Sequence, residues 1–339
     1  MTVYETLPCR VVTGPGARRE IPGEVERLGA RRVLLVATGS ARAAADELAA
    51  ALGARCAARF DRPAVHTPVE VTAEAFAAAR TAGTDAVVAI GGGSAVGLAK
   101  ALAARSGMPQ LAVPTTYAGS EVTPVLGETE RGVKTTRRDP ALAPGTVVYD
   151  PELTVSMPPG LTRASALNAL AHAVEALWAS DATAVTDALA TESATLILAT
   201  LPEVLAEPGA LPARTRLQQA AWLAGLCLAQ TRMGLHHQLA HVLGGAFGLP
   251  HAALHALLLP HVLAFNLPFA EPAAARLTRI AGPDPAAAVA ALAPPTRLRD
   301  LGVPHSGLRE VAERIVAAPY ANPRRFALDD LLGLLDGAW

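Results

Sequence analysis

Residues 85–97 read DAVVAIGGGSAVG and join a short apolar run to a glycine turn. Asp85–Ile90 is short, apolar and rich in β-branched residues, which predicts a buried strand. The alanine-rich segment Ala95–Arg105 follows the turn and predicts a helix. A strand that passes through a tight turn into a helix is part of a βαβ unit, so this stretch predicts an α/β fold.

The same alternation continues on both sides of this stretch. Strand-like runs occupy Arg32–Thr38, Gln110–Val113 and Thr146–Tyr149, and helical patterns occupy Ala43–Leu52 and Thr72–Ala82. Strands that alternate with helices predict a parallel sheet covered by helices on both faces. Because the pattern stops at Asp150-Pro151, we expect one domain over residues 1–151 and a second over residues 152–339.

The second half of the chain has an almost wholly helical pattern. Helices are expected at Ser165–Ser180, Thr183–Thr200, Ala213–Gln230, Gly234–Leu243, His251–Phe265, Gly307–Ala318 and Leu328–Leu335. Prolines at 202, 208, 212, 250, 260 and 268 punctuate these helices, and the proline-rich segments 283–285 and 294–295 are interpreted as surface loops. The second domain is therefore expected to be all-helical.

Composition narrows the class of protein. The chain has 339 residues, a formal net charge of −1 and 51% hydrophobic residues, which suits a two-domain enzyme with ample core. Near-zero charge argues against nucleic acid as a partner. We see no run pure enough to span a membrane and no secretory signal, so a cytoplasmic location is expected. Three widely spaced cysteines, Cys9, Cys56 and Cys227, fit a reducing compartment.

The glycine turn also predicts a binding site for a dinucleotide. Glycines between a strand and a helix allow close approach of the backbone to an anion, and the helix N-terminus favours negative charge. Hydroxyl side chains after the next strand lie at the same edge of the sheet, where α/β proteins bind ligands. The candidate cofactor-binding residues are Gly39, Ser40, Gly91, Gly92, Gly93, Ser94, Thr115 and Thr116. The alternative is a tight turn without a ligand.

Histidines are concentrated in one stretch of the second domain. GLHHQLAHVLGGAFGLPH, which ends at His251, holds four of the nine histidines of the chain. His237 and His241 are four residues apart, so they project from one face of a helix. We expect Gly244 and Gly245 to end or bend that helix and a short loop to bring His251 back to the same pocket.

A second segment repeats the four-residue spacing. His172 follows Asn168 by one turn of an expected helix. Two such helices that face each other predict a cluster of imidazoles, which is how many divalent-metal sites are built. A single histidine on an apolar helix is more often a core or surface residue. His236 is expected to be one of these, structural or facing solvent and directed away from the cluster.

The segment VKTTRRD holds the basic cluster of note. Lys134, Arg137 or Arg138 is expected to receive an anionic group, either a substrate carboxylate or a cofactor phosphate. A solvated loop or hairpin is the alternative interpretation of this segment. Tyr117, which follows Thr116, is a candidate hydrogen-bond partner of the substrate or a packed ring.

Five ordered motifs resemble the iron-containing (group III) alcohol dehydrogenase superfamily. They are GGGSAVGLAKA at Gly91–Ala101, PTTYAGSE at Pro114–Glu121, NALAHAVEAL at Asn168–Leu177, GLHHQLAHVLGG at Gly234–Gly245 and LPHAALHALLLPHVLAFN at Leu249–Asn266. The resemblance implies a dehydroquinate synthase-like fold, with an N-terminal dinucleotide-binding parallel-sheet domain and a C-terminal helical domain. It also implies a cleft between the domains for cofactor and substrate, and a homodimer.

The resemblance further implies the positions of metal ligands. Metal-dependent relatives hold their metal with an aspartate and three histidines, which fall here on Asn168, His172, His237 and His251; His241 matches a histidine beside the nicotinamide. An amide oxygen is a weak neutral ligand, although three histidines could still bind zinc or iron. Asn168 and the shortened motif PTTYAGSE resemble a subfamily regarded as working without metal, so the site is expected to be vestigial.

That subfamily reduces the carbon–carbon double bond of an unsaturated keto dicarboxylate in the breakdown of aromatic compounds. A dicarboxylate substrate requires cations, for which Lys134 is the first candidate and Arg324 the second, followed by Arg137 and Arg138. The resemblance therefore implies that His172, His237, His241 and His251 polarise and protonate the substrate, with His241 or His251 as the proton donor. The alternatives are a metal-dependent alcohol dehydrogenase, a biosynthetic paralogue that acts on another unsaturated or keto acid, and a non-catalytic dinucleotide-binding or sensing protein.

The nicotinamide cofactor is expected to be NADH or NADPH. Many NAD-specific enzymes place an acidic residue after the first strand to bind the ribose 2′-hydroxyl. Residues 38–42 read TGSAR and contain no acid, so NADPH or the use of both cofactors is expected, with Arg42 available for the 2′-phosphate.

Overall fold

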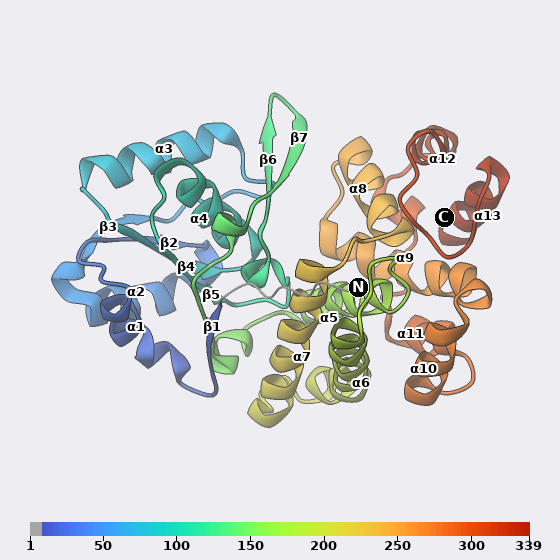
Figure 1. The fold of residues 1–339 in the computed structure, drawn as a ribbon, viewed down its shortest axis with the longest axis horizontal. Coiled ribbons are helices and arrows are strands. Elements are labelled where there is room, and N and C mark those ends of the chain that lie inside the picture. The colour runs from blue at the N-terminus through green and yellow to red at the C-terminus, as the bar shows by residue number, and fades with distance from the viewer. Residues whose placement is uncertain (1–8) are drawn as a thin grey trace. The chain divides into compact units, whose positions relative to one another are not determined.

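The computed structural model describes residues 9–339, apart from the side chain of Lys134. The chain divides into two compact units, of which the first ends at Met157 and the second begins at Pro158. Within the described residues, Figure 1 shows the labelled strands in the first unit and helices α5–α13 in the second. The two units are described separately below.

The first unit is built on a parallel sheet with the strand order β1-β8-β5-β4-β2-β3. The strands are β1 (Arg10–Thr13), β2 (Val33–Ala37), β3 (Cys56–Phe60), β4 (Ala86–Gly91), β5 (Gln110–Pro114) and β8 (Thr146–Tyr149). Strand β3 pairs with one edge of β2, and β4 pairs with the other. The order of the strands therefore reverses between β2 and β4, which is where open α/β sheets bind ligands.

Helices cover both faces of this sheet. They are α1 (Ile21–Arg27), α2 (Arg42–Leu52), α3 (Val69–Thr81) and α4 (Gly93–Ser106). Successive side chains of a strand point to opposite faces. Leu35 on β2 accordingly packs in the cluster that contains Leu48 of α2, whereas Val36 packs with Leu98 of α4. The predicted parallel sheet with helices on both faces is confirmed.

The basic segment forms a hairpin, one of the two expected alternatives. Strands β6 (Val125–Glu130) and β7 (Val133–Arg138) pair in antiparallel register across a turn at Arg131 and Gly132. Both turn residues have positive φ, 50° and 78°, as a two-residue hairpin turn of type I′ requires. Lys134 lies on β7, and its side chain is outside the described part of the chain.

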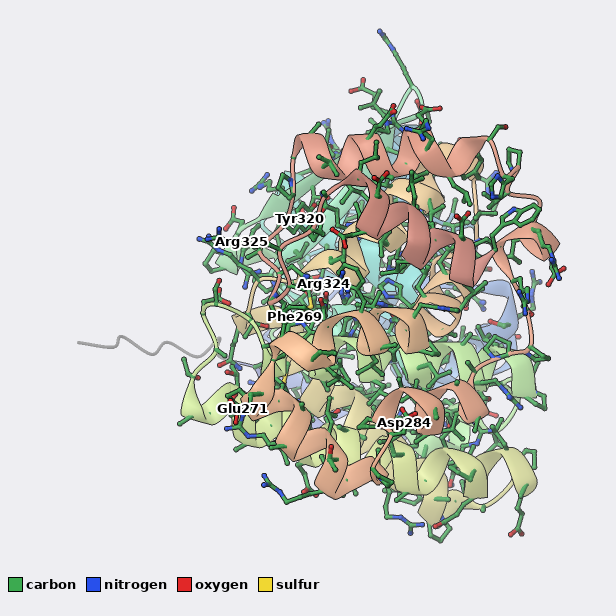
Figure 2. The ribbon with its side chains drawn as sticks, turned by 90° about the vertical axis from the view of Figure 1, so that its right-hand side faces the viewer. Phe269, Glu271, Asp284, Tyr320, Arg324 and Arg325 are labelled. Carbon is green, nitrogen blue, oxygen red and sulfur yellow. The ribbon has the colours of Figure 1, made fainter. Side chains whose placement is uncertain are left out.

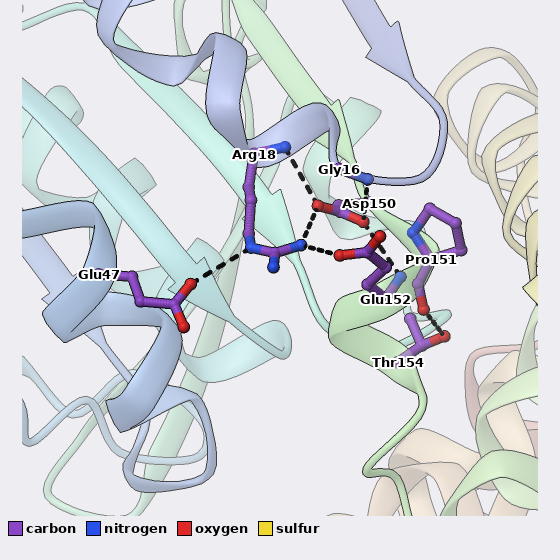
Figure 3. Close-up of polar contacts among 7 residues, drawn as sticks. All are labelled: Gly16, Arg18, Glu47, Asp150, Pro151, Glu152 and Thr154. Carbon is purple, nitrogen blue, oxygen red and sulfur yellow. Dashed lines mark hydrogen bonds and ion pairs between the residues drawn. The ribbon is translucent and has the colours of Figure 1, made fainter. Parts of the chain in front are cut away.

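A buried carboxylate holds the N-terminal loop of the first unit to the end of β8 (Figure 3). Asp150 is fully buried and accepts hydrogen bonds from the backbone N–H groups of Gly16, Arg18 and Glu152 at 3.1–3.2 Å. The Arg18 guanidinium adds an ion pair to Asp150 at 2.7 Å and a contact to Glu152. Because its oxygens accept several N–H bonds, the buried charge is compensated.

The second unit contains only helices among its described elements. They are α5 (Pro159–Leu177), α6 (Ala184–Ala206), α7 (Leu211–Gln230), α8 (Leu235–Phe247), α9 (His251–Asn266), α10 (Glu271–Ala281), α11 (Pro285–Leu292), α12 (Gly307–Ala317) and α13 (Leu328–Ala338). Every residue of α5 from Ser165 to Leu177 is buried, and α5 contacts α6, α7 and α9. A helix that is buried all round lies inside its domain, so α5 is the core helix of this unit.

Two expected helix ends were wrong. Helix α8 continues through Gly244 and Gly245 to Phe247 and ends at Gly248, which has φ 65°. Only the last of these glycines adopts the left-handed conformation that terminates a helix. Helix α6 continues past Thr200 and contains Pro202, because tertiary packing of the helix outweighs one lost hydrogen bond. Pro260 lies inside α9, within the helix expected over His251–Phe265.

Several short elements had no sequence signal that we interpreted. Strand β3 reads CAARF, lies at the edge of the sheet and is only partly buried, so it lacks an apolar pattern. Strand β1 is also an edge strand, and α1 and α10 were not predicted. Helix α11 lies where a proline-rich loop was expected, because Pro285 occupies its first turn and Asp284 caps its N-terminus.

Two helical segments, 184–206 and 251–269, are long and apolar enough to cross a membrane by length and composition alone. The expectation that the chain has no such run was therefore too strong. In the most apolar 18 residues of these two segments, 39% and 56% respectively are buried. Core helices of soluble proteins pass the same test of length and composition. The segment 251–269 also carries histidines of the cluster described below, which fits a place inside a folded domain.

Candidate active site

The glycine turn lies at the carboxyl edge of the sheet in the first unit, at the switch between β2 and β4. Gly91 ends β4 with φ 148°, a conformation that side chains rarely adopt. A Cβ atom on Gly91 would lie 2.6 Å from Oγ1 of Thr38, the residue that follows β2. Glycine is thus required because the turn passes directly against the end of the neighbouring strand. Thr38 was not among the predicted site residues, although its position after a buried strand was a usable signal.

Neighbouring strand ends bring the other predicted cofactor-binding residues to the same edge. The N–H of Thr115 donates to the carbonyl of Gly91 at 3.0 Å, and a Cβ on Gly92 would lie 3.1 Å from Cγ2 of Thr116. Ser40 lies within 3.2 Å of Thr38 through their hydroxyl oxygens. Helix α4 has no side-chain cap at its N-terminus. The N–H of Ala95 already donates to the carbonyl of Gly92 at 3.0 Å, which leaves those of Gly93 and Ser94 for an anion such as pyrophosphate.

The second unit contains a group of six imidazoles, called here the histidine cluster. Its members come from α5, α8 and α9, and they are His172, His236, His237, His241, His251 and His255. The rings of His172 and His237 stack with centroids 5.0 Å apart, and those of His241 and His251 stack at 5.7 Å. The prediction that the two histidine-bearing segments face each other, and that His251 returns to the same pocket, is confirmed.

Exposure varies across the cluster. His172, His236, His237 and His255 are at most 3% exposed, whereas His251 is partly exposed and His241 is exposed. The cluster thus runs from the interior of the domain to its surface. The two histidines expected to donate the proton, His241 and His251, are the outer members, and their role in proton transfer stays a prediction.

Two members of the cluster were misjudged or missed from the sequence. His236 was expected to face away, but it is fully buried, and its Nε2 lies 2.7 Å from Nδ1 of His255. His255 was not singled out, although it follows His251 by four residues and so shares its helix face. Nε2 of His255 lies 3.1 Å from Nε2 of His251. His255 therefore joins an inner and an outer member of the cluster.

A buried carboxylate, Glu175, supports the cluster from α5. It accepts hydrogen bonds from the backbone N–H groups of Gly234, His236 and His237, and it contacts Nδ1 of His237 at 2.6 Å. These donors belong to the first turn of α8, whose N-terminus favours a negative charge. Glu175 follows His172 by three residues on an apolar helix face, a spacing that could have identified it from the sequence.

The contact with Glu175 determines which nitrogen of His237 carries hydrogen. Above about pH 7 Glu175 is ionised and only accepts hydrogen bonds, so Nδ1 of His237 is then the protonated nitrogen. Nε2 of His237 then presents a lone pair, and this buried atom has no hydrogen-bond partner among the described residues. His237 can accept a hydrogen bond at the site but cannot donate one there.

Burial controls the protonation of the inner cluster. It lowers the pKa of His172 and of His236 to about 3, and neighbouring imidazoles act in the same direction. The pKa values of His237 and His255 are also held well below the usual value by burial. Burial raises the pKa of Glu175 to about 7, although its three backbone donors oppose this change. The inner imidazoles are therefore neutral at neutral pH.

Asn168 lies one turn before His172 on α5, as predicted, and is buried. Its Oδ1 atom and Nδ1 of His172 have no hydrogen-bond partner among the described residues. Unsatisfied buried polar atoms are costly, so these positions favour a water molecule or a polar group of a ligand.

The other predicted substrate-binding residues have partners of their own. The Arg324 guanidinium pairs with Asp330 at 2.6 Å and lies over the rings of Phe265 and Phe269 at 4.0 and 5.2 Å. Figure 2 shows Arg324 and Phe269 near Tyr320 and Arg325. Binding of a substrate carboxylate by Arg324 stays a prediction, and it would use the guanidinium N–H groups that do not bond Asp330.

In the first unit, Tyr117 is fully buried, and its hydroxyl donates to Oγ1 of Thr154 at 3.3 Å. This geometry matches the packed-ring alternative, and contact with substrate stays a prediction. Arg137 is exposed and pairs with Asp139 at 2.5 Å, and Arg138 ends the same strand, β7.

Sequence profiles of one enzyme family match two successive parts of the chain. A profile described as iron-containing alcohol dehydrogenase matches residues 8–151, and the C-terminal profile of the Fe-containing alcohol dehydrogenase family matches residues 162–339. Maleylacetate reductase 1 from Rhodococcus opacus is 46% identical over 343 residues, which cover 99% of this chain and 96% of the relative.

Solved structures agree with these matches. The crystal structure of maleylacetate reductase from Agrobacterium tumefaciens has a TM-score of 0.96 and 42% identity, and the match covers 100% of this chain and 98% of that one. Sulfoacetaldehyde reductase from Bifidobacterium kashiwanohense, solved in complex with NAD+, has a TM-score of 0.89 and 25% identity over 100% of this chain and 99% of its own.

The family description names iron, and the implied ligand positions are Asn168, His172, His237 and His251. Asn168 offers a neutral amide oxygen where a carboxylate would supply negative charge. Nε2 of His251 is engaged by Nε2 of His255 at 3.1 Å. Across residues 9–339, no three His, Cys, Asp or Glu side chains come together in a way that could hold a metal ion. These residues do not fit a divalent metal site.

Proposed function

Because the chain belongs to the iron-containing alcohol dehydrogenase family, we propose that it reduces the carbon–carbon double bond of maleylacetate to 3-oxoadipate with a hydride from a nicotinamide cofactor. The chain is an oxidoreductase that uses an NAD(H)-type cofactor. The observation that carries the choice of substrate is the 46% identity, over nearly the full length of both chains, to a protein named maleylacetate reductase.

The reaction adds one hydride and one proton across the double bond. The hydride leaves the reduced nicotinamide and attacks the alkene carbon remote from the ketone, so the electron pair moves into the conjugated carbonyl as an enolate. The enolate oxygen needs a hydrogen-bond donor, and the neighbouring carbon then takes a proton. The oxidised nicotinamide and 3-oxoadipate are the products.

The geometry distributes these roles among the imidazoles. His237 presents a lone pair to the site, so the donor to the enolate oxygen must come from His172, His241 or His251. The proton donor must be recharged after each turnover. His241 and His251 reach the surface of the molecule, where water can reprotonate them, so one of these two serves as the donor.

The remaining expectations become part of the proposal. Lys134 and Arg324, with Arg137 and Arg138 behind them, are the candidate cations for the two substrate carboxylates. The resemblance supports a homodimer and a cytoplasmic metabolic enzyme without nucleic acid or membrane partners. We also propose catalysis without metal, which is supported by the neutral donor set at Asn168 and by the engagement of His251 with His255.

The proposed function is tested by anaerobic oxidation of NADH and NADPH with freshly generated maleylacetate, with EDTA in one sample and added iron or zinc in another. We expect activity that survives EDTA, and comparable or better efficiency with NADPH because Arg42 is exposed at the start of α2. An efficiency with NADH more than about tenfold higher, a difference of about 1.4 kcal/mol, contradicts the cofactor choice.

The other outcomes separate the alternatives. Activity that appears only with added metal contradicts the metal-free proposal and favours a metal-dependent dehydrogenase. Tight binding of NADPH without any reduction of maleylacetate contradicts the proposed substrate and favours another unsaturated or keto acid.

A further inference from the structure

We propose that the side chain of His255 takes the place of a metal ion at the centre of the histidine cluster and holds His251 in its working orientation. The role of His251 in this statement rests on the proposed function, whereas the position of His255 rests on geometry alone. His255 follows His251 by one turn of α9, so both rings lie on the same side of that helix.

His255 occupies a central position among the imidazoles. Its ring centroid lies 4.3 Å from that of His251, 4.6 Å from His237 and 4.8 Å from His236. The ring of His172 is 6.3 Å away. Imidazoles from three helices, α5, α8 and α9, thus surround one fully buried side chain. A metal ion bound by such a set would also lie at the convergence of these helices.

Both nitrogens of His255 are engaged. Nδ1 lies 2.7 Å from Nε2 of His236, and Nε2 lies 3.1 Å from Nε2 of His251. A neutral imidazole has one N–H donor and one lone pair, so one of these bonds is donated and the other accepted. The three rings therefore form a chain whose tautomers are linked, and the state of His251 is coupled to that of His255.

The surroundings keep this chain uncharged. His255 is fully buried among imidazoles, where a charged ring would be costly. A metal ion would bring two positive charges that need a carboxylate nearby, and the amide of Asn168 does not supply one. A neutral imidazole tethers the same side chains without that charge, so the substitution at Asn168 and the presence of His255 belong together.

The decisive experiment measures gain of metal binding in purified full-length protein. The variants are Asn168→Asp, His255→Ala and the double variant Asn168→Asp/His255→Ala, each dialysed against excess Co²⁺ and then against buffer. We expect about one retained Co²⁺ per chain, with the visible absorption bands of a nitrogen- and oxygen-bound ion, only in the double variant. Removing His255 takes away its contact with Nε2 of His251, and the aspartate restores the charge.

Two results would overturn the proposal. One is retention of Co²⁺ by Asn168→Asp alone to the same extent as by the double variant, because His255 would then not occupy the metal's place. The other is a double variant that is folded by circular dichroism and retains no Co²⁺. Metal content is measured without substrate. This test of His255 therefore does not depend on whether the protein reduces maleylacetate.

A second set of variants tests the positioning of His251. In His255→Gln the side-chain amide reaches the position of Nε2 and can bond His251. In His255→Asn the shorter amide reaches only the position of Nδ1, which faces His236. We expect kcat to fall about 10-fold or more in His255→Asn and to recover in His255→Gln, with unchanged affinity for NADPH. Equal kcat in the two variants means that His255 only fills space, and this result would contradict the positioning role.

Discussion

At the scale of single residues, the chemistry of the histidine cluster depends on how deeply each ring is buried. His172 and His236 are buried, and their pKa values of about 3 keep them neutral, so they serve as polar groups rather than as acids. His241 and His251 lie at the accessible end and stack on each other at 5.7 Å. A proton donor needs contact with both substrate and solvent, and these two residues meet the second requirement.

Substitution of the outer histidines tests this division. We expect His241→Ala and His251→Ala each to lower kcat by about 10²-fold or more, with the larger loss at the proton donor. In His251→Ala the dissociation constant of NADPH, measured by fluorescence titration, should stay unchanged, because the glycine turn belongs to the other unit and His241, the histidine expected beside the nicotinamide, is kept. His305→Ala, which removes an exposed histidine on the loop before α12, is the matched control and should keep full activity. A loss of kcat in the control equal to that in the variants would contradict the assignment.

At the scale of secondary-structure elements, the start of α8 is built around the carboxylate of Glu175. Three backbone N–H groups of its first turn and the ring of His237 converge on this one side chain. The close approach requires a glycine, since a Cβ on Gly234 would lie 2.8 Å from the carbonyl oxygen of Ala321 and 3.0 Å from Oε1 of Glu175. The position of the histidines on α8 thus depends on Gly234.

Two glycine-to-alanine variants of the same region compare a crowded site with an open one. Gly234→Ala should lower the free energy of unfolding by about 1–3 kcal/mol, because backbone and carboxylate must move apart. Gly245→Ala should raise it by about 0.5–1 kcal/mol, because Gly245 lies inside α8 with nothing within 4 Å of the added Cβ. Urea denaturation measures both values. If both variants change the free energy of unfolding by a similar amount in the same direction, the added Cβ at Gly234 causes no destabilising crowding, and the prediction is wrong.

At the scale of the whole molecule, the buried cluster links stability to pH. The pKa of His172 and of His236 is about 3 in the folded chain against a model value of 6.5. Between these values the unfolded chain binds protons that the folded chain does not, so stability is lost as pH falls below about 6.5. Glu175 acts in the opposite sense, because its pKa rises from 4.5 to about 7 and its stabilisation is lost as pH rises through that value.

The histidines outnumber this single carboxyl group, so we expect a net fall in the free energy of unfolding from pH 7 to pH 4. Each unit of pKa difference is worth about 1.4 kcal/mol. In His172→Leu the fall should be smaller, because one fewer proton is taken up on unfolding. Urea denaturation at several pH values provides the measurement, and an unchanged slope in His172→Leu would refute the linkage.

The sequence by itself determined the features that depend on local spacing. Apolar runs and glycine turns predicted the parallel sheet, because a strand and the helix after it are encoded by contiguous residues. The four-residue spacings of His237 and His241 and of Asn168 and His172 predicted a common helix face for each pair. The edge strands were missed because their half-buried residues carry no apolar pattern.

The tertiary structure alone decided which atoms meet. Glu175 is 59 residues from Gly234 in the chain, and no local pattern shows that its carboxylate bonds the first turn of α8. The same holds for His236 and His255, which are 19 residues apart yet share a hydrogen bond. Such contacts depend on how the helices are rotated and packed against one another, and this rotation assigns the tautomer of His237 and the central place of His255.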